Sequence, residues 1–140
     1  MPDRAQQDFD TIRRNVVTLL NYACDPPSLC ALPFSYALCK ALAIPDPSTM
    51  VHALIERALQ QDVNGRWLRE ALYLAHLSGY PTKTSAAHAM HISRRHFHRM
   101  YAAAVDRVAA YIAQTVTIQG PAELLLGNGP SILGRHDSEC

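Results

Sequence analysis

Apolar residues recur along most of the chain at intervals of three and four positions, the spacing that places them on one face of an α-helix. The first such segment covers residues 4–24 and stops before Pro26, because proline cannot continue the hydrogen-bond ladder of a helix. The same spacing returns in residues 28–44 (a short helix after Pro33), 48–59, 66–77, 84–90 and 93–115. A short run at residues 115–118 is the one candidate for a strand. The pattern therefore predicts an all-α fold of about six helices.

Length and composition narrow the class of protein without indicating a function. The chain has 140 residues, which suits a single domain, and 49% of them are hydrophobic while 18% are charged. This is too apolar for a disordered chain, and no run approaches the ~20 consecutive apolar residues of a membrane-spanning helix. The formal net charge is only +1, so an acidic partner can be inferred only from the local distribution of charge.

The cysteines do not indicate a disulfide framework or a metal centre. They are Cys24, Cys30, Cys39 and Cys140. None forms a C-x-x-C pair, no histidine follows at zinc-finger spacing, and the N-terminus shows no export signal. We therefore expect reduced thiols, a cytoplasmic location, no metal and no cofactor.

Basic and imidazole side chains gather in one stretch of the second half. Between Lys83 and Arg99 there are four Lys or Arg residues and no Asp or Glu. The stretch also holds four of the seven histidines, namely His88, His91, His96 and His98. A merely solvated helix face usually mixes both signs of charge, so this stretch is the best candidate for contact with an anionic partner.

The apolar positions of this stretch indicate two helices joined by a tight turn at His91 and Ile92. Ala87 is small and falls where the second helix would cross the first closely. Met90, Ile92 and Phe97 would fill the angle between the two helices. The pattern predicts a rigid corner that leaves the polar side chains on its outer side.

The second helix carries the candidate binding residues at its start. We expect the hydroxyl of Ser93 to cap this helix by accepting a backbone N–H. The residues left outside the corner are Ser93, Arg94, Arg95, His96, His98 and Arg99. Such a helix start suits the DNA major groove, where arginine can bond guanine through two hydrogen bonds and other cations neutralise phosphates. Lys83 and Thr84, at the start of the first helix, are expected to contact backbone phosphates.

Residues 67–112 resemble the helix-turn-helix of bacterial regulators, the motif shared by region four of sigma factors and LuxR-type DNA-binding domains. The matching residues are Ala86, Ala87, Met90, Ile92, Ser93 and Phe97. His91 departs from the family pattern, which usually places glycine at this turn position because φ is positive there. Histidine tolerates that left-handed region better than most residues do.

The resemblance implies a sequence-specific, DNA-binding transcriptional regulator of bacterial type. Residues 100–112 are similar to the extended recognition helix of the family, here beginning at Ser93. We expect double-stranded DNA, a second copy of the chain in a homodimer, and RNA polymerase or another regulator as partners. In this interpretation residues 1–62 form an N-terminal helical region, 63–118 the helix-turn-helix DNA-binding region, and 119–140 a flexible C-terminal tail.

Other interpretations use the same residues differently. The helices could form a protein-interaction adaptor or regulatory subunit that does not bind DNA, and the proline-punctuated region 28–47 would suit such a role. The four clustered histidines could bind a metal, although no cysteine or carboxylate accompanies them. Trp67 and Tyr73 are expected in the core. No Ser-His-Asp order, glycine-rich phosphate loop or carboxylate pair indicates catalysis, so we expect no enzyme activity.

Overall fold

The fold is all-helical, as the apolar spacing predicted. A computed structural model describes residues 4–60, 62–77 and 82–119, and this part of the chain contains no strand. Its α-helices are α1 (Arg4–Asn21), α2 (Pro26–Ala31), α3 (Pro33–Leu42), α4 (Pro47–Leu59), α5 (Gly65–Leu72), α6 (Lys83–Ala89) and α7 (Arg94–Gln119). A single π-helical turn, η1 (Tyr73–Leu77), follows α5 directly. The tail was expected at 119–140; Gln119 instead ends α7, and residues 120–140 lie outside the described residues.

Prolines begin three of the helices. Pro26, Pro33 and Pro47 occupy the first turns of α2, α3 and α4. Proline suits this position because the first turn needs no N–H donor and its fixed φ is already helical. The sequence pattern located the helix after Pro33 but missed α2, where the prolines that end the first helix also start the next. In α4, Asp46 is the capping residue, and its carboxylate accepts a hydrogen bond from the Thr49 amide at 2.9 Å.

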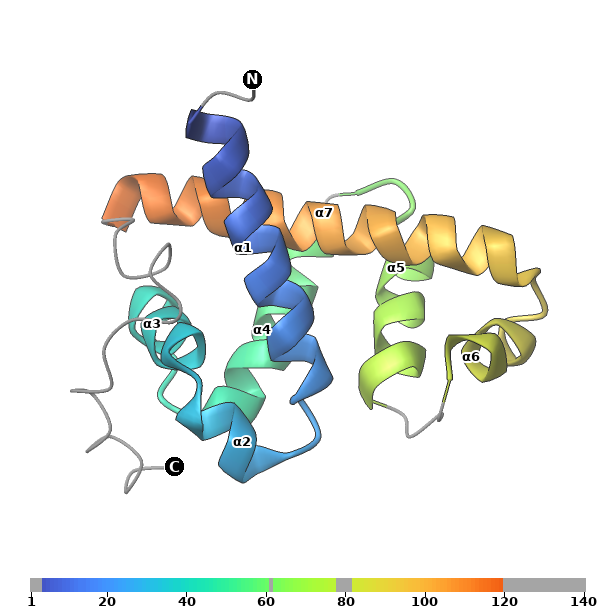
Figure 1. Cartoon of the computed structure of the whole chain (residues 1–140), viewed down its shortest axis with the longest axis horizontal. Coiled ribbons are helices and arrows are strands. Elements are labelled where there is room, and N and C mark those ends of the chain that lie inside the picture. The colour runs from blue at the N-terminus through green and yellow to red at the C-terminus, as the bar shows by residue number, and fades with distance from the viewer. Residues whose placement is uncertain (1–3, 61, 78–81, 120–140) are drawn as a thin grey trace.

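The long helix α7 organises the core. It packs against α1, α3, α4, α5 and α6, and it runs along one side of the molecule in Figure 1. Its buried side chains are Phe97, Tyr101, Ala104, Val105, Val108, Ala109 and Ile112. These join one apolar cluster that extends from α1 to α7. The expectation of a strand at residues 115–118 is wrong, because α7 continues as a helix through Gln119.

Helix α5 is held to α4 by a polar network at their surface. Arg69 Nη1 lies 2.8 Å from Glu56 Oε1, and the Tyr73 hydroxyl donates a hydrogen bond to Glu56 Oε2 at 2.9 Å. Partial burial together with this bond to a carboxylate raises the pKa of Tyr73 to about 12. The network holds α5 and η1 against α4.

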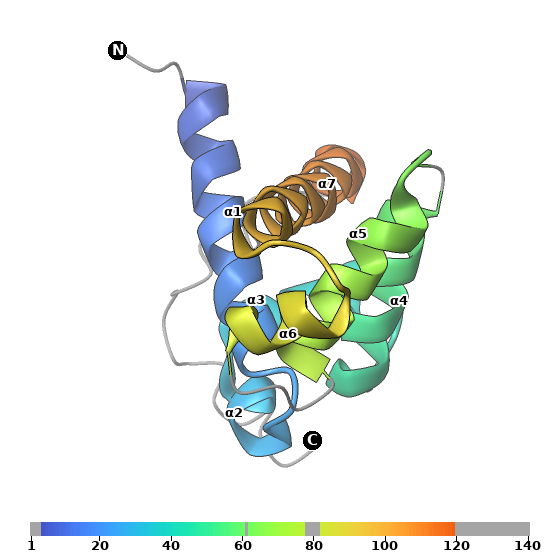
Figure 2. The ribbon, with the colours of Figure 1, turned by 90° about the vertical axis from the view of Figure 1, so that its right-hand side faces the viewer.

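Figure 2 looks along α7 from its beginning. In this view α1 lies on one side of α7, α4 and α5 lie on the other, and α6 lies below its first turns. Residues on both sides of position 62 therefore contribute helices that contact α7. Among the described residues, no helix has the length and apolar character needed to cross a bilayer.

Candidate nucleic-acid interface

The predicted corner is formed by α6, the turn at residues 90–93, and the start of α7. Thr82 caps α6, since its hydroxyl oxygen accepts a hydrogen bond from the Ser85 amide at 3.0 Å. Ser93 caps α7, and its Oγ accepts a hydrogen bond from the His96 amide at 3.1 Å. The expected Ser93 cap is therefore confirmed. Both helix starts are defined by short side chains whose oxygens satisfy otherwise unpaired backbone donors.

The turn between the helices depends on His91. Its φ is 60°, in the left-handed region that the turn was expected to require. The His91 amide bonds back to the His88 carbonyl at 3.0 Å, and the Ile92 amide to the Ala87 carbonyl at 3.2 Å. A helix end closed by two such back-bonds needs one left-handed residue after its last turn. His91 fills this position with its side chain exposed.

The inside of the corner is closely packed. Ala87 is 2% exposed and Phe97 is fully buried, while Met90 is buried and Ile92 half-buried. The Phe97 ring is nearly parallel to the Tyr101 ring, with their centroids 6.4 Å apart. A larger side chain at Ala87 would push the two helices apart, which explains the small residue there. The corner thus holds the start of α7 in one orientation.

The outside of the corner presents the basic residues. The side chains of Ser93, Arg94, Arg95, His96, His98 and Arg99 are all exposed. Arg95 and Arg99 are four positions apart, as are Arg94 and His98, so each pair shares a side of α7. Among the described residues, none of the three arginines forms an ion pair with a carboxylate. Their charge is available to a partner.

The two residues predicted on the first helix of the corner behave differently. Thr84 is exposed, but Lys83 is half-buried, with its Nζ 4.4 Å from the centre of the Tyr101 ring. The Tyr101 hydroxyl in turn lies 2.6 Å from His76 Nε2. Burial, with a smaller contribution from the nearby Lys83 charge, lowers the pKa of His76 to about 4. The Lys83–Tyr101 contact thus joins α6 to α7, and the His76–Tyr101 hydrogen bond joins η1 to α7.

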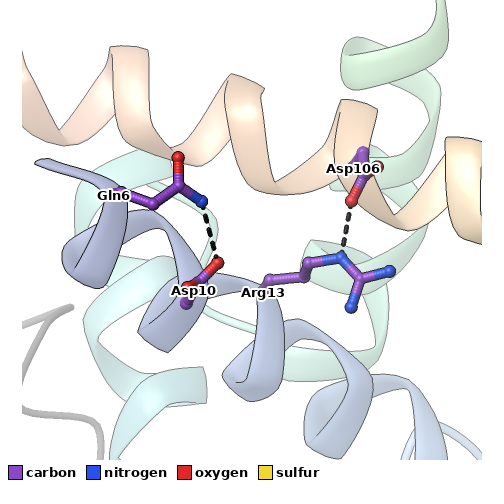
Figure 3. A network of polar contacts seen from close by, with 4 residues as sticks. All are labelled: Gln6, Asp10, Arg13 and Asp106. Carbon is purple, nitrogen blue, oxygen red and sulfur yellow. Dashed lines mark hydrogen bonds and ion pairs between the residues drawn. The ribbon is translucent and has the colours of Figure 1, made fainter. Parts of the chain in front are cut away.

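Helix α1 crosses α7 beyond the basic residues. Asp106 is the only carboxylate in the sequence of α7, and its Oδ1 lies 2.5 Å from Arg13 Nε (Figure 3). On the same helix as Arg13, Gln6 donates a hydrogen bond to Asp10 at 3.1 Å. The Arg13–Asp106 ion pair offsets the charge of the one acidic side chain on α7.

Trp67 is the residue whose position the sequence pattern did not predict. Its side chain is 55% exposed, so the expectation of a core tryptophan is wrong. The buried face of α5 is formed by Leu68, Ala71 and Leu72, which places Trp67 at its edge. The indole lines a groove together with Asn64, Leu68, Ile92, His96 and Met100. The three-and-four spacing could not have shown this, because Trp67 is four positions before Ala71 and so fits the apolar set of the helix.

The clustered histidines do not assemble into a metal centre. In residues 4–60, 62–77 and 82–119, no three His, Cys, Asp or Glu side chains are placed to hold a metal ion. No family model, curated protein or solved structure matches the chain. The chemistry of the corner itself therefore carries the functional interpretation: a rigid, capped helix start with guanidinium groups on its outer side that pair with no carboxylate of the described residues.

Proposed function

We propose that this protein is a sequence-specific DNA-binding regulator of transcription, with the start of α7 entering the major groove. The observation that carries the proposal is the set of exposed guanidinium and imidazole groups on the first two turns of α7, held outward by a buried corner. An α-helix about 10–12 Å across fits a major groove about 12 Å wide. The free arginines supply the charge that attracts the phosphates on both walls of that groove.

The proposed roles follow from the position of each side chain. Arg94 and Arg95 lie in the first turn and would reach base edges, where an arginine can donate two hydrogen bonds to guanine O6 and N7. Arg99 lies one turn later and would meet a phosphate. Thr84, exposed at the start of α6, could donate its hydroxyl to a phosphate as well. Lys83 has a smaller part in this scheme, because its ammonium lies over Tyr101.

A single corner of this kind contacts few base pairs, so we further propose that two copies bind adjacent half-sites. Half-sites read by paired recognition helices are spaced about 34 Å apart, one turn of DNA. The protein would act in the bacterial cytoplasm, where the bound copies could contact RNA polymerase or a second regulator. A symmetric binding site is the expected signature of such a pair.

The test is selection of bound duplexes from a random pool at two salt concentrations, followed by sequencing. A common sequence motif and a steep loss of affinity with rising salt are expected, because phosphate contacts release counterions. Arg94→Ala or Arg95→Ala should cost about 1–3 kcal/mol at a read base and relax the preference there. Lys40→Ala, an exposed cation on α3, is the matched control and should leave the motif unchanged.

The alternative function is a helical protein-interaction adaptor. A protein contact formed by apolar side chains depends little on salt, whereas a contact to several phosphates depends on it steeply. Absence of any enriched motif, together with equal losses for the Lys40 and Arg95 variants, would contradict the proposal of sequence-specific binding.

A further inference from the structure

The groove beside α7 is an unusual surface feature. Trp67 is 55% exposed, and Val63, four positions before it, is 99% exposed. Val63 does not line the groove, so the indole of Trp67 is the exposed large apolar side chain within it. Tryptophan is enriched at interaction surfaces because its ring is apolar and its N–H can donate a hydrogen bond. The groove lies between the start of α5 and one side of α7. It is therefore next to the surface proposed to enter DNA.

Helix geometry relates the groove to the basic residues. His96 and Met100 are four positions apart, so they share one side of α7, and that side lines the groove. Arg95 and Arg99 precede them by one position each, which places the arginines on the neighbouring side of the same two turns. A helix about 10–12 Å across nearly fills a major groove about 12 Å wide. When α7 lies in the major groove, the protein surface directly beside α7 would then face the DNA strand that forms one wall of the major groove.

The charge around this protein groove suits contact with the sugar–phosphate backbone of a DNA strand. None of the six residues that line it is acidic. Asp62 lies two positions before Asn64, the first residue that lines the groove. Its carboxylate accepts hydrogen bonds from the Arg107 guanidinium and from the backbone N–H of Asn64, the latter at 2.8 Å. These bonds hold the pKa of Asp62 below its ordinary value and offset its charge. The groove therefore combines an apolar indole with an imidazole and an amide, which together match a deoxyribose and its phosphate.

Resting on the proposed function, we propose that this groove seats the sugar–phosphate backbone of one DNA strand. A deoxyribose lies against the Trp67 indole, and the adjoining phosphate faces His96 and Asn64. A second copy of the chain is the less suitable occupant. In a symmetric contact through this groove the arginine-rich starts of the two α7 helices would lie close together, and like charges at an interface oppose association.

Trp67 is the only tryptophan in the chain, so its fluorescence reports on the groove directly. A labelled duplex carrying the selected site is titrated with the full chain, and anisotropy of the label measures binding. Tryptophan emission and its quenching by acrylamide are read in the same samples. We expect the emission to shift to shorter wavelength and the quenching to fall as the duplex saturates the protein.

A variant series separates a backbone contact from base reading. Trp67→Ala should weaken binding about tenfold, the scale of losing one aromatic contact to a nucleotide. The loss should be the same on the selected site and on scrambled duplex, because backbone contacts carry no sequence information. Trp67→Phe should recover most of the affinity. Tyr22→Ala, which removes an exposed aromatic at the end of α1, is the matched control and should change nothing.

The outcomes distinguish the two proposals. Saturating duplex binding with unchanged acrylamide quenching of Trp67 would overturn the groove assignment while leaving DNA binding intact. A Trp67→Ala loss confined to the selected site would also overturn it, since the indole would then be reading bases. No anisotropy change with any duplex would reject the proposed function and, with it, this assignment.

Discussion

Arg13 of α1 and Asp106 of α7 form an ion pair across 93 positions of the sequence, with Nε and Oδ1 2.5 Å apart. Both side chains are close to half exposed, so water screens the attraction and the pair contributes at most about 1 kcal/mol to folding. Its larger effect is on the electrostatic field of α7. With Asp106 paired, no unpaired carboxylate on α7 opposes the charge of Arg94, Arg95 and Arg99 on the same helix.

Arg13→Ala should therefore weaken duplex binding more than it destabilises the fold, because it leaves the Asp106 carboxylate unpaired on the helix proposed to enter the major groove. The double variant Arg13→Ala/Asp106→Ala should recover the affinity of the natural protein. Duplex titrations and urea unfolding of the single and double variants measure the two effects. An affinity that stays as low in the double variant as in Arg13→Ala would show that Arg13 itself touches DNA.

His91→Gly should leave the free energy of unfolding unchanged or raise it by up to about 1 kcal/mol. Glycine relieves the positive φ of His91 but adds freedom to the unfolded chain, and the two effects partly cancel. Ala43, with φ 59°, should respond to glycine in the same way. Ala103→Gly, inside the regular helix α7, is the contrasting control and should lose about 1 kcal/mol. Urea unfolding of the three variants makes the comparison, and equal destabilisation of all three would be inconsistent with the turn.

Gly65→Ala should destabilise the protein by about 1–3 kcal/mol, the range for forcing extra atoms into a packed site. A Cβ at this position would collide with the backbone carbonyl of Leu59, which cannot move without displacing the end of α4. The same substitution should disturb the start of α5. Thermal unfolding measures the stability, and the emission of Trp67 reports the local change. An unaltered melting temperature would mean that the two helices separate at little cost.

Acid should destabilise the fold through His76. Burial lowers its pKa in the folded state to about 4, while the ordinary value is 6.5, so the unfolded chain binds the extra proton first. The stability contributed by neutral His76 is complete above pH 6.5 and is lost as the pH falls toward 4. After allowance for partial exposure, the loss is about 2 kcal/mol.

His76→Gln keeps a polar partner for the Tyr101 hydroxyl but does not titrate. Its free energy of unfolding should therefore fall less than that of the natural protein between pH 7 and pH 4.5, as measured with urea. If the free energies of unfolding of the two proteins fall equally over this pH range, the destabilising proton binds to a group other than His76. The other histidines are common to both proteins, so the difference isolates His76.

Features that depend on neighbouring residues were predicted from the sequence. The spacing of apolar side chains located most helices, and the hydroxyl of Ser93 marked the start of α7. The left-handed turn at His91 was implied by the resemblance to helix-turn-helix regulators, whose pattern spans the same few residues. Each of these depends on backbone bonds spanning three to five positions, so the information is contained within one short segment.

Features that depend on distant parts of the chain were not predicted. Trp67 is exposed because nothing else in the described fold covers the edge of α5. Lys83 faces Tyr101 rather than solvent because α7 folds back over α6. Helix α2 needs its buried Leu29 to contact the rest of the core, since six residues form no stable helix alone. Such outcomes are decided by tertiary packing.

The unbroken length of α7 has a mechanical consequence. Its 26 residues begin at the basic outer surface and end among α1, α3 and α4, with no kink-forming proline or glycine between them. The orientation of Arg94 and Arg95 is thus set by the packing of the whole helix, including the half that lies far from them. A fragment that begins at residue 63 would leave Val105, Val108 and Ile112 facing water. The orientation of the first turn of α7 would then no longer be fixed by packing.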